Sequence, residues 1–281
     1  MKHLAAVYKE SVEFAKAHYE NFPVVSLLIK KDLRKHIAVI YRFSRTADDM
    51  ADEGSFTSEE RLEMLNSFEE KLASSIKGNF TSPFEEALYH TINDRNLTSA
   101  YFFNLLTAFK QDVCKKRYEN FDNLLAYCRN SANPVGRLVL ELYDIRNDHA
   151  FYLSDKICTA LQLTNFYQDT LIDFEKGRIY YPLDEMERFG AEEKLFDLRQ
   201  NNLNLSKLLE FNIRRARKFF EEGKELIDYL NGSLKLEIRW TILGGEAVLR
   251  KIEDNNYNIF QERPSLTKKD FILLFLKSLI K

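Results

Sequence analysis

Apolar residues recur along this chain with the 3.6-residue period of helices, and no segment shows the two-residue alternation of strands. We find no repeat and no interdomain linker. The pattern therefore predicts one all-α domain of roughly ten helices over residues 1–281. The predicted helices span residues 3–19, 32–52, 58–77, 83–93, 98–116, 121–144, 154–174, 206–231, 234–254 and 267–281.

Proline and glycine mark the expected interruptions. The first helix should end before Pro23, because the residue that precedes proline avoids the helical region. Gly54 is a stop signal for the helix over 32–52. Pro134 lies in the middle of 121–144, where we expect a kink or a break. Ala132 and Gly136 on either side of it would let another backbone or a ligand approach closely.

The composition agrees with a helical protein and narrows its functions. The chain has only 9 Gly and 5 Pro, where average usage gives roughly 20 and 14. Hydrophobic residues make up 45%, with 22 Phe and 14 Tyr, so a sizeable core is available. A net charge of -2 and a pI near 6.3 give no reason to expect nucleic-acid binding.

Signals for secretion and membrane insertion are missing from the sequence. The N-terminus lacks the apolar core of a secretory signal, and no stretch approaches the roughly 18 uncharged apolar residues of a membrane span. Three cysteines, Cys114, Cys128 and Cys158, have no zinc-type spacing and are expected to be reduced thiols. We predict a cytoplasmic protein that can be peripheral to the inner membrane.

Two segments more than a hundred residues apart carry aspartates four positions apart. Asp48 and Asp52, with Asp49 beside them, form a first acidic motif, and Asp169 and Asp173 form a second. Residues i and i+4 project from one side of a helix. If the two helices face each other, at least four carboxylates meet, and so much negative charge implies cations. The alternative for each motif is a solvated helix face.

The two helices differ in how their polar residues are distributed. On 32–52, Asp48 and Asp52 share a sector with Tyr41 and are expected to point inward, whereas Asp49 falls on a wetted flank. The helix over 154–174, with Ser154 or Asp155 as its candidate cap, is apolar around most of its circumference and should be buried. A polar stripe on such a helix usually lines a cavity. It consists of Cys158, Gln162, Asn165, Asp169 and Asp173.

Carboxylates in this number suit Mg²⁺, which often keeps substrate phosphates in its shell. The chain has no EF-hand loop and no His/Cys cluster for zinc. Mg²⁺ held by acids would neutralise a diphosphate leaving group, so a carbon–oxygen bond could ionise to a carbocation. Such a cation needs a water-poor pocket with aromatic and amide dipoles. Arg45 and Arg178 could hold diphosphate oxygens, or could form salt bridges to nearby aspartates.

These motifs resemble those of the squalene/phytoene synthase family of trans-isoprenyl diphosphate synthases, over nearly the whole chain from about His18 to Arg263. The first motif matches at Tyr41, Arg45, Asp48, Asp49 and Asp52, and the second at Gln162, Asn165, Asp169 and Asp173, followed by Arg178, Tyr180 and Pro182. The resemblance implies a single-domain, isoprenoid-synthase-type all-α fold with a central cavity, in which the aspartates bind Mg²⁺ and prenyl diphosphate.

The resemblance also implies roles for single residues. Asp48, Asp52, Asp169 and Asp173 would hold the metals, with Asp49 a weaker ligand. Arg45 and Arg178 would bind the diphosphate. The groups expected to steer the cation or the attacking water are Tyr41, Tyr127, Gln162 and Asn165, with Arg45 also counted as catalytic. Further substrate contacts are expected from His18, Asn21, Phe22, Ala132, Gly136 and Tyr180.

Within the family, residues 18–24, 47–54 and 131–136 are similar to the bacterial hopanoid-pathway branch. Its enzymes ionise presqualene diphosphate and let water capture the rearranged cation, giving hydroxysqualene for a downstream reductase. Gln168 and Ile172 stand where the wider family usually has a basic and an acidic residue, which favours a site for one diphosphate. No Gly-rich dinucleotide fingerprint is present, so no nicotinamide cofactor is expected.

Two alternatives stay open from the sequence. One is head-to-head condensation of two prenyl diphosphates, such as farnesyl diphosphate, to presqualene diphosphate, squalene or a phytoene-type product. The other is a non-catalytic helical binding or assembly factor, which the five retained aspartates disfavour. A greasy substrate favours contact with a membrane surface. The apolar run 271–276 could provide that contact, or could pack on the core.

Overall fold

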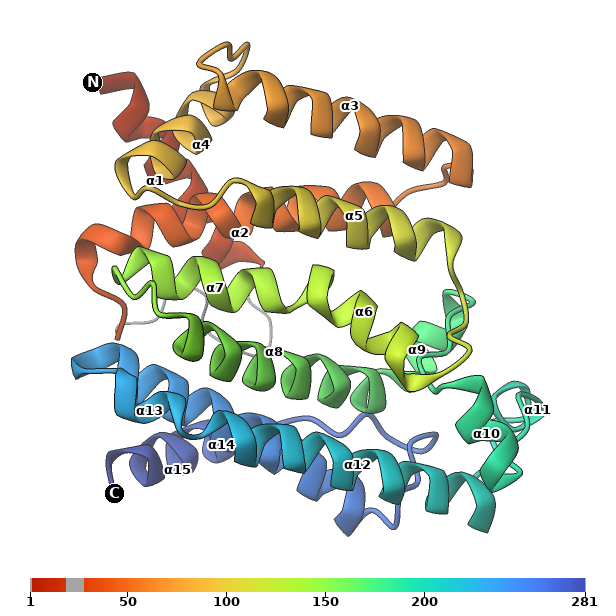
Figure 1. The fold of residues 1–281 in the computed structure, drawn as a ribbon. Helices are drawn as coiled ribbons and strands as arrows, with labels where there is room; N and C mark the ends of the chain where they lie inside the picture. Colours follow the sequence, from red (N-terminus) through yellow and green to blue (C-terminus); the bar gives the residue numbers. More distant parts are fainter. Residues whose placement is uncertain (1, 19–27, 281) are drawn as a thin grey trace. The chain divides into compact units, whose positions relative to one another are not determined.

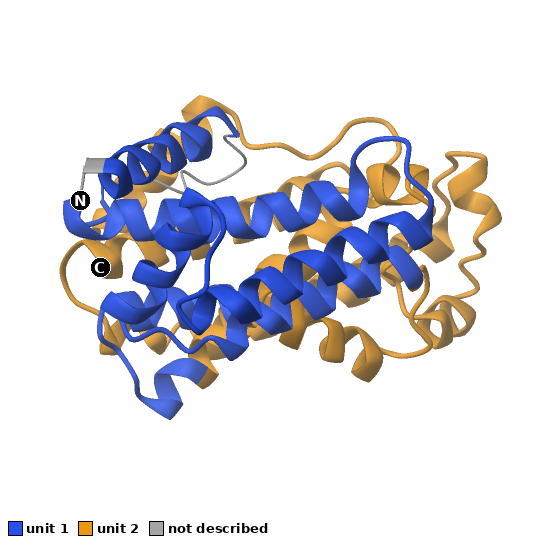
Figure 2. Ribbon diagram, turned by 90° about the horizontal axis from the view of Figure 1, so that it is seen from above, with its two compact units in different colours: residues 1–114, 134–151 blue, residues 115–133, 152–281 orange. Residues whose placement is uncertain are grey.

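A computed structural model of the chain describes residues 2–18 and 28–280, which form helices joined by loops and turns (Figure 1). No strand occurs in these ranges, which confirms the all-α prediction. The helices belong to two compact units, coloured separately in Figure 2. Unit 1 comprises residues 1–114 and 134–151, and unit 2 comprises residues 115–133 and 152–281. The prediction of a single domain with a central cavity stays a prediction.

Unit 1 is organised around the helix that carries the first acidic motif. Its helices are α1 (Lys2–Ala17), α2 (Lys31–Asp52), α3 (Ser58–Ile76), α4 (Pro83–Asp94), α5 (Ala100–Cys114) and nearly all of α7 (Asn133–Leu142). α2 packs against α1, α3, α4 and α5. Six of its buried side chains recur every three or four residues and form one apolar face, at Leu33, Ile37, Ile40, Phe43, Ala47 and Ala51. This apolar face fixes the rotation of α2 and leaves the aspartates on other faces.

Local signals define the ends of these helices. The Thr57 hydroxyl accepts from the backbone N–H of Glu60, whose carboxylate accepts from the N–H of Thr57, a complete capping box at the start of α3. Pro83 begins α4, where its missing N–H has no cost. Gly54 follows α2 with a φ of +75°, as expected for a stop residue.

Buried His36 makes the stability of unit 1 depend on pH. Its Nδ1 lies 3.1 Å from Thr91 Oγ1. Burial, reinforced by Lys35 and Arg95 and opposed by Asp94 and Asp32, lowers the pKa of His36 from 6.5 to about 4. His36 is therefore protonated below about pH 6.5 in the unfolded chain, but only below about pH 4 in the folded chain. Stability is complete above pH 6.5 and is lost as the pH falls through this window.

We expect the free energy of unfolding to drop by about 2 kcal/mol between pH 7 and pH 5 because of His36 alone. Urea denaturation of wild type and of His36→Gln at both pH values measures this contribution, since other groups titrate equally in both proteins. The wild type should lose more stability than the variant. An identical loss in the two proteins would contradict the assignment.

Unit 2 contains the helix of the second acidic motif. Its helices are α6 (Phe121–Ser131), most of α8 (Asp148–Gln168), α9 (Thr170–Glu175), α10 (Leu183–Phe189), α11 (Lys194–Asp197), α12 (Leu203–Gly223), α13 (Leu226–Tyr229), α14 (Gly232–Asp254) and α15 (Lys268–Leu279). Gly223 lets α12 approach α8, because a Cβ there would lie 2.6 Å from Ile157 Cγ1. Gly245 on α14 likewise lies against Phe220 and Leu161. The predicted burial of this stretch of α8 is confirmed.

Several predicted boundaries are corrected by the structure. The expected break near Pro134 is confirmed, since α6 ends at Ser131 and α7 begins at Asn133. The helix predicted over 154–174 begins instead at Asp148, where Asn147 Oδ1 accepts from the Ala150 N–H at 3.0 Å. Ser154 and Asp155 are therefore interior residues and not caps. The segment 206–231 is divided into α12 and α13, and α10 and α11 were not predicted. The described residues thus form fifteen helices.

Within the described ranges, no helix is both long enough and apolar enough to cross a bilayer.

Candidate active site

The first acidic motif occupies the last two turns of α2, and Tyr41 lies two turns earlier. Tyr41 Oη donates a 2.7 Å hydrogen bond to the backbone carbonyl of His18 at the end of α1. The His18 ring stacks on Phe14 at a centroid distance of 4.1 Å. Tyr41 therefore ties the end of α1 to α2. The predicted contacts Asn21 and Phe22 lie outside the described residues.

Arg45 is the counterion of the first acidic motif. Its Nη1 lies 3.1 Å from Asp48 Oδ2, and its Nε lies 2.8 Å from Asp49 Oδ1. Both aspartates turn toward this guanidinium, and their side chains are 40% and 39% exposed. The predicted contrast between an inward Asp48 and a wetted Asp49 is therefore wrong, because both side chains are exposed to the same extent. Asp52 is half-buried.

Arg61 holds the end of α2 and was not found by sequence reasoning. Its guanidinium donates to the carbonyls of Met50, Glu53 and Gly54 at 3.2, 2.9 and 2.8 Å. The Met50 carbonyl lies in the last turn of α2, and the carbonyls of Glu53 and Gly54 follow the helix. Carbonyls at a helix end have no N–H donor from within the helix. Arg61 thereby fixes the turn from which Asp52 projects. Nothing in the sequence marks this arginine among the many others.

The polar stripe predicted on the second acidic helix is confirmed as its accessible face. Cys158, Gln162, Asp169 and Asp173 are half-buried and Asn165 is exposed. Most neighbouring side chains of this helix, among them Leu163 and Tyr167, are buried. Whether the stripe lines a cavity stays a prediction.

Asp169 lies where the helix is interrupted, between α8 and α9, with φ −101° and ψ 15°. Arg263, in the loop before α15, donates from both Nε and Nη2 to the Asp169 carboxylate. Gln168 is buried, and its amide donates to the carbonyl of Pro264 at 2.5 Å. Two adjacent side chains therefore fasten residues 263–264 to the second acidic motif. Asp173 lies 4.0 Å from the guanidinium of buried Arg178.

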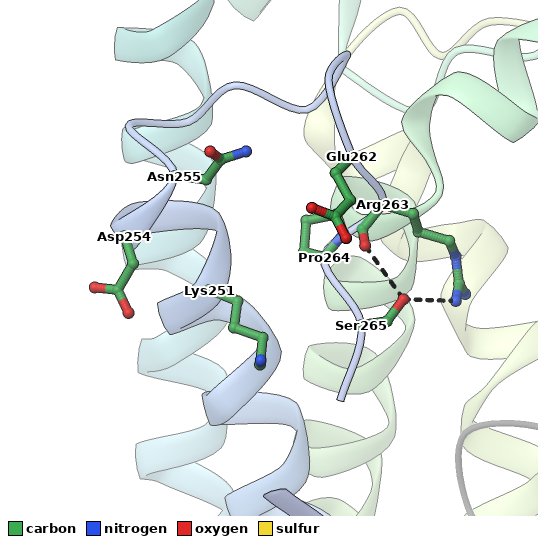
Figure 3. Close-up of a pocket in the computed structure, with 7 residues that line it drawn as sticks. All are labelled: Lys251, Asp254, Asn255, Glu262, Arg263, Pro264 and Ser265. Carbon is green, nitrogen blue, oxygen red and sulfur yellow. Dashed lines mark hydrogen bonds between the residues drawn. The ribbon is translucent and has the colours of Figure 1, made fainter. Parts of the chain in front are cut away.

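A polar cavity of about 390 Å³ adjoins Arg263 (Figure 3). Its lining residues are Lys251, Asp254, Asn255, Glu262, Arg263, Pro264 and Ser265. In Figure 3 Arg263 turns toward Ser265, whose hydroxyl lies 3.4 Å from Nη1. Lys251 pairs with Asp270 at 3.0 Å. Two cations of this lining therefore pair with carboxylates of the protein, Arg263 with Asp169 and Lys251 with Asp270.

Aromatic side chains gather beside the second acidic motif. Phe166 and Tyr180 stack with centroids 3.8 Å apart and planes 9° from parallel. Tyr127 lies 5.8 Å from Tyr180 and 6.1 Å from Phe166. Tyr118, which sequence reasoning missed, stacks on Tyr180 at 5.8 Å. The structure thus brings together predicted Tyr127 and Tyr180 in a buried cluster of four rings.

The remaining predicted contacts flank the break between α6 and α7. Ala132 is buried and is the C-cap residue after α6, and its N–H donates to the Cys128 carbonyl. Gly136 is half-buried within α7.

The acidic motifs have the donor chemistry that a divalent cation requires. Their candidate ligands are carboxylate oxygens, the hard donors that Mg²⁺ prefers, and all five side chains are only partly buried. In the part of the chain that the structure describes, no three His, Cys, Asp or Glu side chains already converge on one point. Instead Arg45, Arg263 and Arg178 lie against the acids. The residues fit a metal that would replace these arginines as the counterion.

Comparison with known proteins identifies the family of this chain. The family model of squalene/phytoene synthases matches residues 15–270. Hydroxysqualene synthase of Rhodopseudomonas palustris is 32% identical over 252 residues, covering 89% of this chain and 82% of that protein. Hydroxysqualene synthase of Zymomonas mobilis is 42% identical over 176 residues, covering 61% of this chain and 58% of that protein.

Solved structures extend the comparison to the fold. The crystal structure of squalene synthase HpnC from Alicyclobacillus acidocaldarius superposes with a TM-score of 0.86 and 36% identity, covering 92% of this chain and 97% of the other. The chain belongs to the squalene/phytoene synthase family. It is accordingly an all-α enzyme of prenyl diphosphate chemistry, which confirms the family resemblance seen in the sequence.

Proposed function

We propose that this enzyme ionises presqualene diphosphate and lets water capture the rearranged carbocation, forming hydroxysqualene. The observation that carries the proposal is the 32% identity to a hydroxysqualene synthase over 89% of the chain. The carbon–oxygen bond of the substrate breaks, its electron pair leaves with the diphosphate, and water adds to the cation and loses a proton. The electron balance closes without a nicotinamide cofactor.

The two acidic motifs would bind the diphosphate through Mg²⁺, which supplies the charge that stabilises the leaving group. Asp48, Asp52, Asp169 and Asp173 are the proposed ligands, with Asp49 a weaker one. Arg45 and Arg178 are placed beside these acids and would donate to diphosphate oxygens once the acids are engaged. Arg263 joins them in this proposal, because it contacts Asp169 in the same way.

The polar and aromatic groups nearby would handle the cation. Phe166, Tyr127 and Tyr180 offer π-faces, which attract positive charge without acting as nucleophiles. Gln162 and Asn165 lie on the accessible stripe of α8 and could hold the attacking water. Tyr41 and His18, with Asn21 and Phe22, are the proposed substrate contacts near the end of α1. Ala132 and Gly136 are further proposed contacts.

Gln168 supports a site for one diphosphate. Its amide is buried and donates a hydrogen bond to the carbonyl of Pro264. Gln168 therefore does not replace the function of the basic residue that the wider family usually has at this position. A substrate with a single diphosphate needs fewer cations than two separate prenyl diphosphates do. This feature favours the presqualene-consuming step over condensation.

The test is turnover by the purified full-length chain with Mg²⁺. Presqualene diphosphate alone should give hydroxysqualene, and the reaction in ¹⁸O-labelled water should give a heavier product by mass spectrometry. Robust turnover of farnesyl diphosphate without added presqualene diphosphate would overturn the proposal. It would favour the condensing reaction named by relatives such as phytoene synthase of Arthrospira platensis, 29% identical over 90% of this chain.

The product chemistry also defines proposed partners and location. Conversion of hydroxysqualene to squalene replaces the hydroxyl with hydride and therefore needs a reductant, so a downstream reductase is expected in the hopanoid pathway. Substrate and product are both lipids. We therefore propose a cytoplasmic enzyme that works at the inner membrane surface.

A further inference from the structure

The last helix of the structure leaves a wide apolar face uncovered. Five large aliphatic side chains of α15 and its C-cap are between 48% and 74% exposed, namely Ile272, Leu273, Leu276, Leu279 and Ile280. Ile272, Leu276 and Leu279 are spaced by four and three residues and therefore lie on one side of the helix, with Leu273 beside them and Ile280 following at the C-cap. Scattered exposed leucines are normal on a protein surface, but five on three turns form a patch.

The opposite side of α15 is firmly packed, so the direction of this face is fixed. The Trp240 ring of α14 meets Phe271 and Phe275 edge to face at 6.2 and 5.4 Å, and Trp240 Nε1 donates to the Phe271 carbonyl at 3.2 Å. Leu274 is buried. A complete capping box at Thr267 and Asp270 begins the helix. The exposed face is therefore built into the fold and is not a frayed end.

The exposed charged residues of α15 itself are all lysines. Lys268, Lys269 and Lys277 are all exposed. The acidic residue of the helix, Asp270, is engaged by Lys251 at 3.0 Å and by its own capping box. An amphipathic helix with an apolar face and flanking lysines matches a lipid surface that carries anionic headgroups.

A second copy of the chain fits this face less well. A stable dimer buries about 800 Å² on each partner, more than one face of a twelve-residue helix offers. A two-fold contact would also bring the lysines of two copies together. Since lipid needs no matching surface and its anionic headgroups attract the lysines, we propose that the exposed face of α15 docks on an anionic lipid surface. This proposal rests on the proposed function only in that it identifies the part of the chain that would contact the membrane. It does not depend on which substrate the enzyme uses.

Co-sedimentation of the full chain with vesicles tests the proposal. We expect binding to phosphatidylcholine vesicles that contain phosphatidylglycerol, and at least about tenfold weaker binding to phosphatidylcholine alone. Ile272→Ser/Leu276→Ser should weaken binding by about tenfold or more, because two aliphatic side chains lose their lipid contact. The matched control is Leu198→Ser/Leu203→Ser, which replaces two exposed leucines elsewhere in unit 2 and should bind as wild type.

Three results would overturn the docking surface. They are failure of wild type to bind anionic vesicles, equal weakening by the control, and a change from dimer to monomer in the α15 variant, which would identify a second copy as the occupant. Turnover in detergent separates this proposal from the proposed function. The α15 variant should retain wild-type turnover of presqualene diphosphate there, and an inactive wild type in that assay would count against the reaction but not against the surface.

Discussion

Asp169→Asn is expected to lower turnover by about 10³-fold in a protein that still folds. The substitution keeps the shape of the side chain but removes the charge that a metal ligand must supply. The ion pair of Asp169 with Arg263 is partly exposed, so its loss should cost less than about 1 kcal/mol of stability. Activity and stability are therefore expected to separate. Asp48→Asn should behave in the same way.

The measurement is kcat/KM together with thermal stabilisation by Mg²⁺ and inorganic diphosphate. Wild type should be stabilised by the two ligands together, and both variants should lose most of this shift. Asp228→Asn is the control, since it removes one exposed carboxylate of the same unit that lies outside the motifs. Normal turnover in either motif variant would remove the metal assignment.

Glu185→Leu is expected to destabilise unit 2 by about 3–5 kcal/mol, because it leaves a largely buried arginine without its counterion. The Arg215 guanidinium contacts both Glu185 oxygens, at 2.5 and 2.7 Å. The two side chains are only 16% and 10% exposed. Arg215 also lies 3.5 Å over the Phe121 ring and donates to Asn212 Oδ1, to which Tyr167 donates in turn. The network thus joins α6, α10 and α12 to the second acidic helix.

Replacing both partners should restore most of the loss. Glu185→Leu/Arg215→Met leaves no unpaired charge, and such apolar replacements are often neutral. Urea denaturation of the two single variants and the double variant forms the thermodynamic cycle. Arg214→Met is the control, since the adjacent Arg214–Glu210 pair on α12 is exposed and should matter by less than about 1 kcal/mol. A double variant as unstable as Glu185→Leu would show that pairing is not the cause.

The helices of both acidic motifs could be predicted from periodicity, but the interruption at Asp169 could not. No proline or glycine marks it. The Thr170 hydroxyl, which contacts the carbonyls of Phe166 and Tyr167 at 2.8 and 3.2 Å, also lies 2.8 Å from Tyr181 Oη. A side chain that bonds to the backbone of its own helix competes with the regular ladder. Tyr181 lies beyond the end of α9, so helical periodicity near Asp169 does not indicate this contact.

The counterions of the two motifs differ in how far the sequence could predict them. Arg45 lies one turn from Asp48 and Asp49, so helical spacing alone anticipates its contacts. Arg263 is 94 residues from Asp169, and only the fold brings them together. The one available signal was that the family resemblance extends to Arg263. That the two acidic motifs face each other stays a prediction.

The ion pairs of the acidic motifs have a thermodynamic consequence for the proposed reaction. In unit 1, Arg45 neutralises Asp48 and Asp49, and in unit 2, Arg263 neutralises Asp169. A carboxylate that binds a metal cation must release its arginine. The released arginine is then without a counterion and can bind an anion. Neither Mg²⁺ nor diphosphate alone satisfies both partners. If the motifs bind Mg²⁺ and diphosphate as proposed, the two affinities would be linked, each raising the other by the same factor, and the magnesium-complexed substrate would be bound in preference to either component alone.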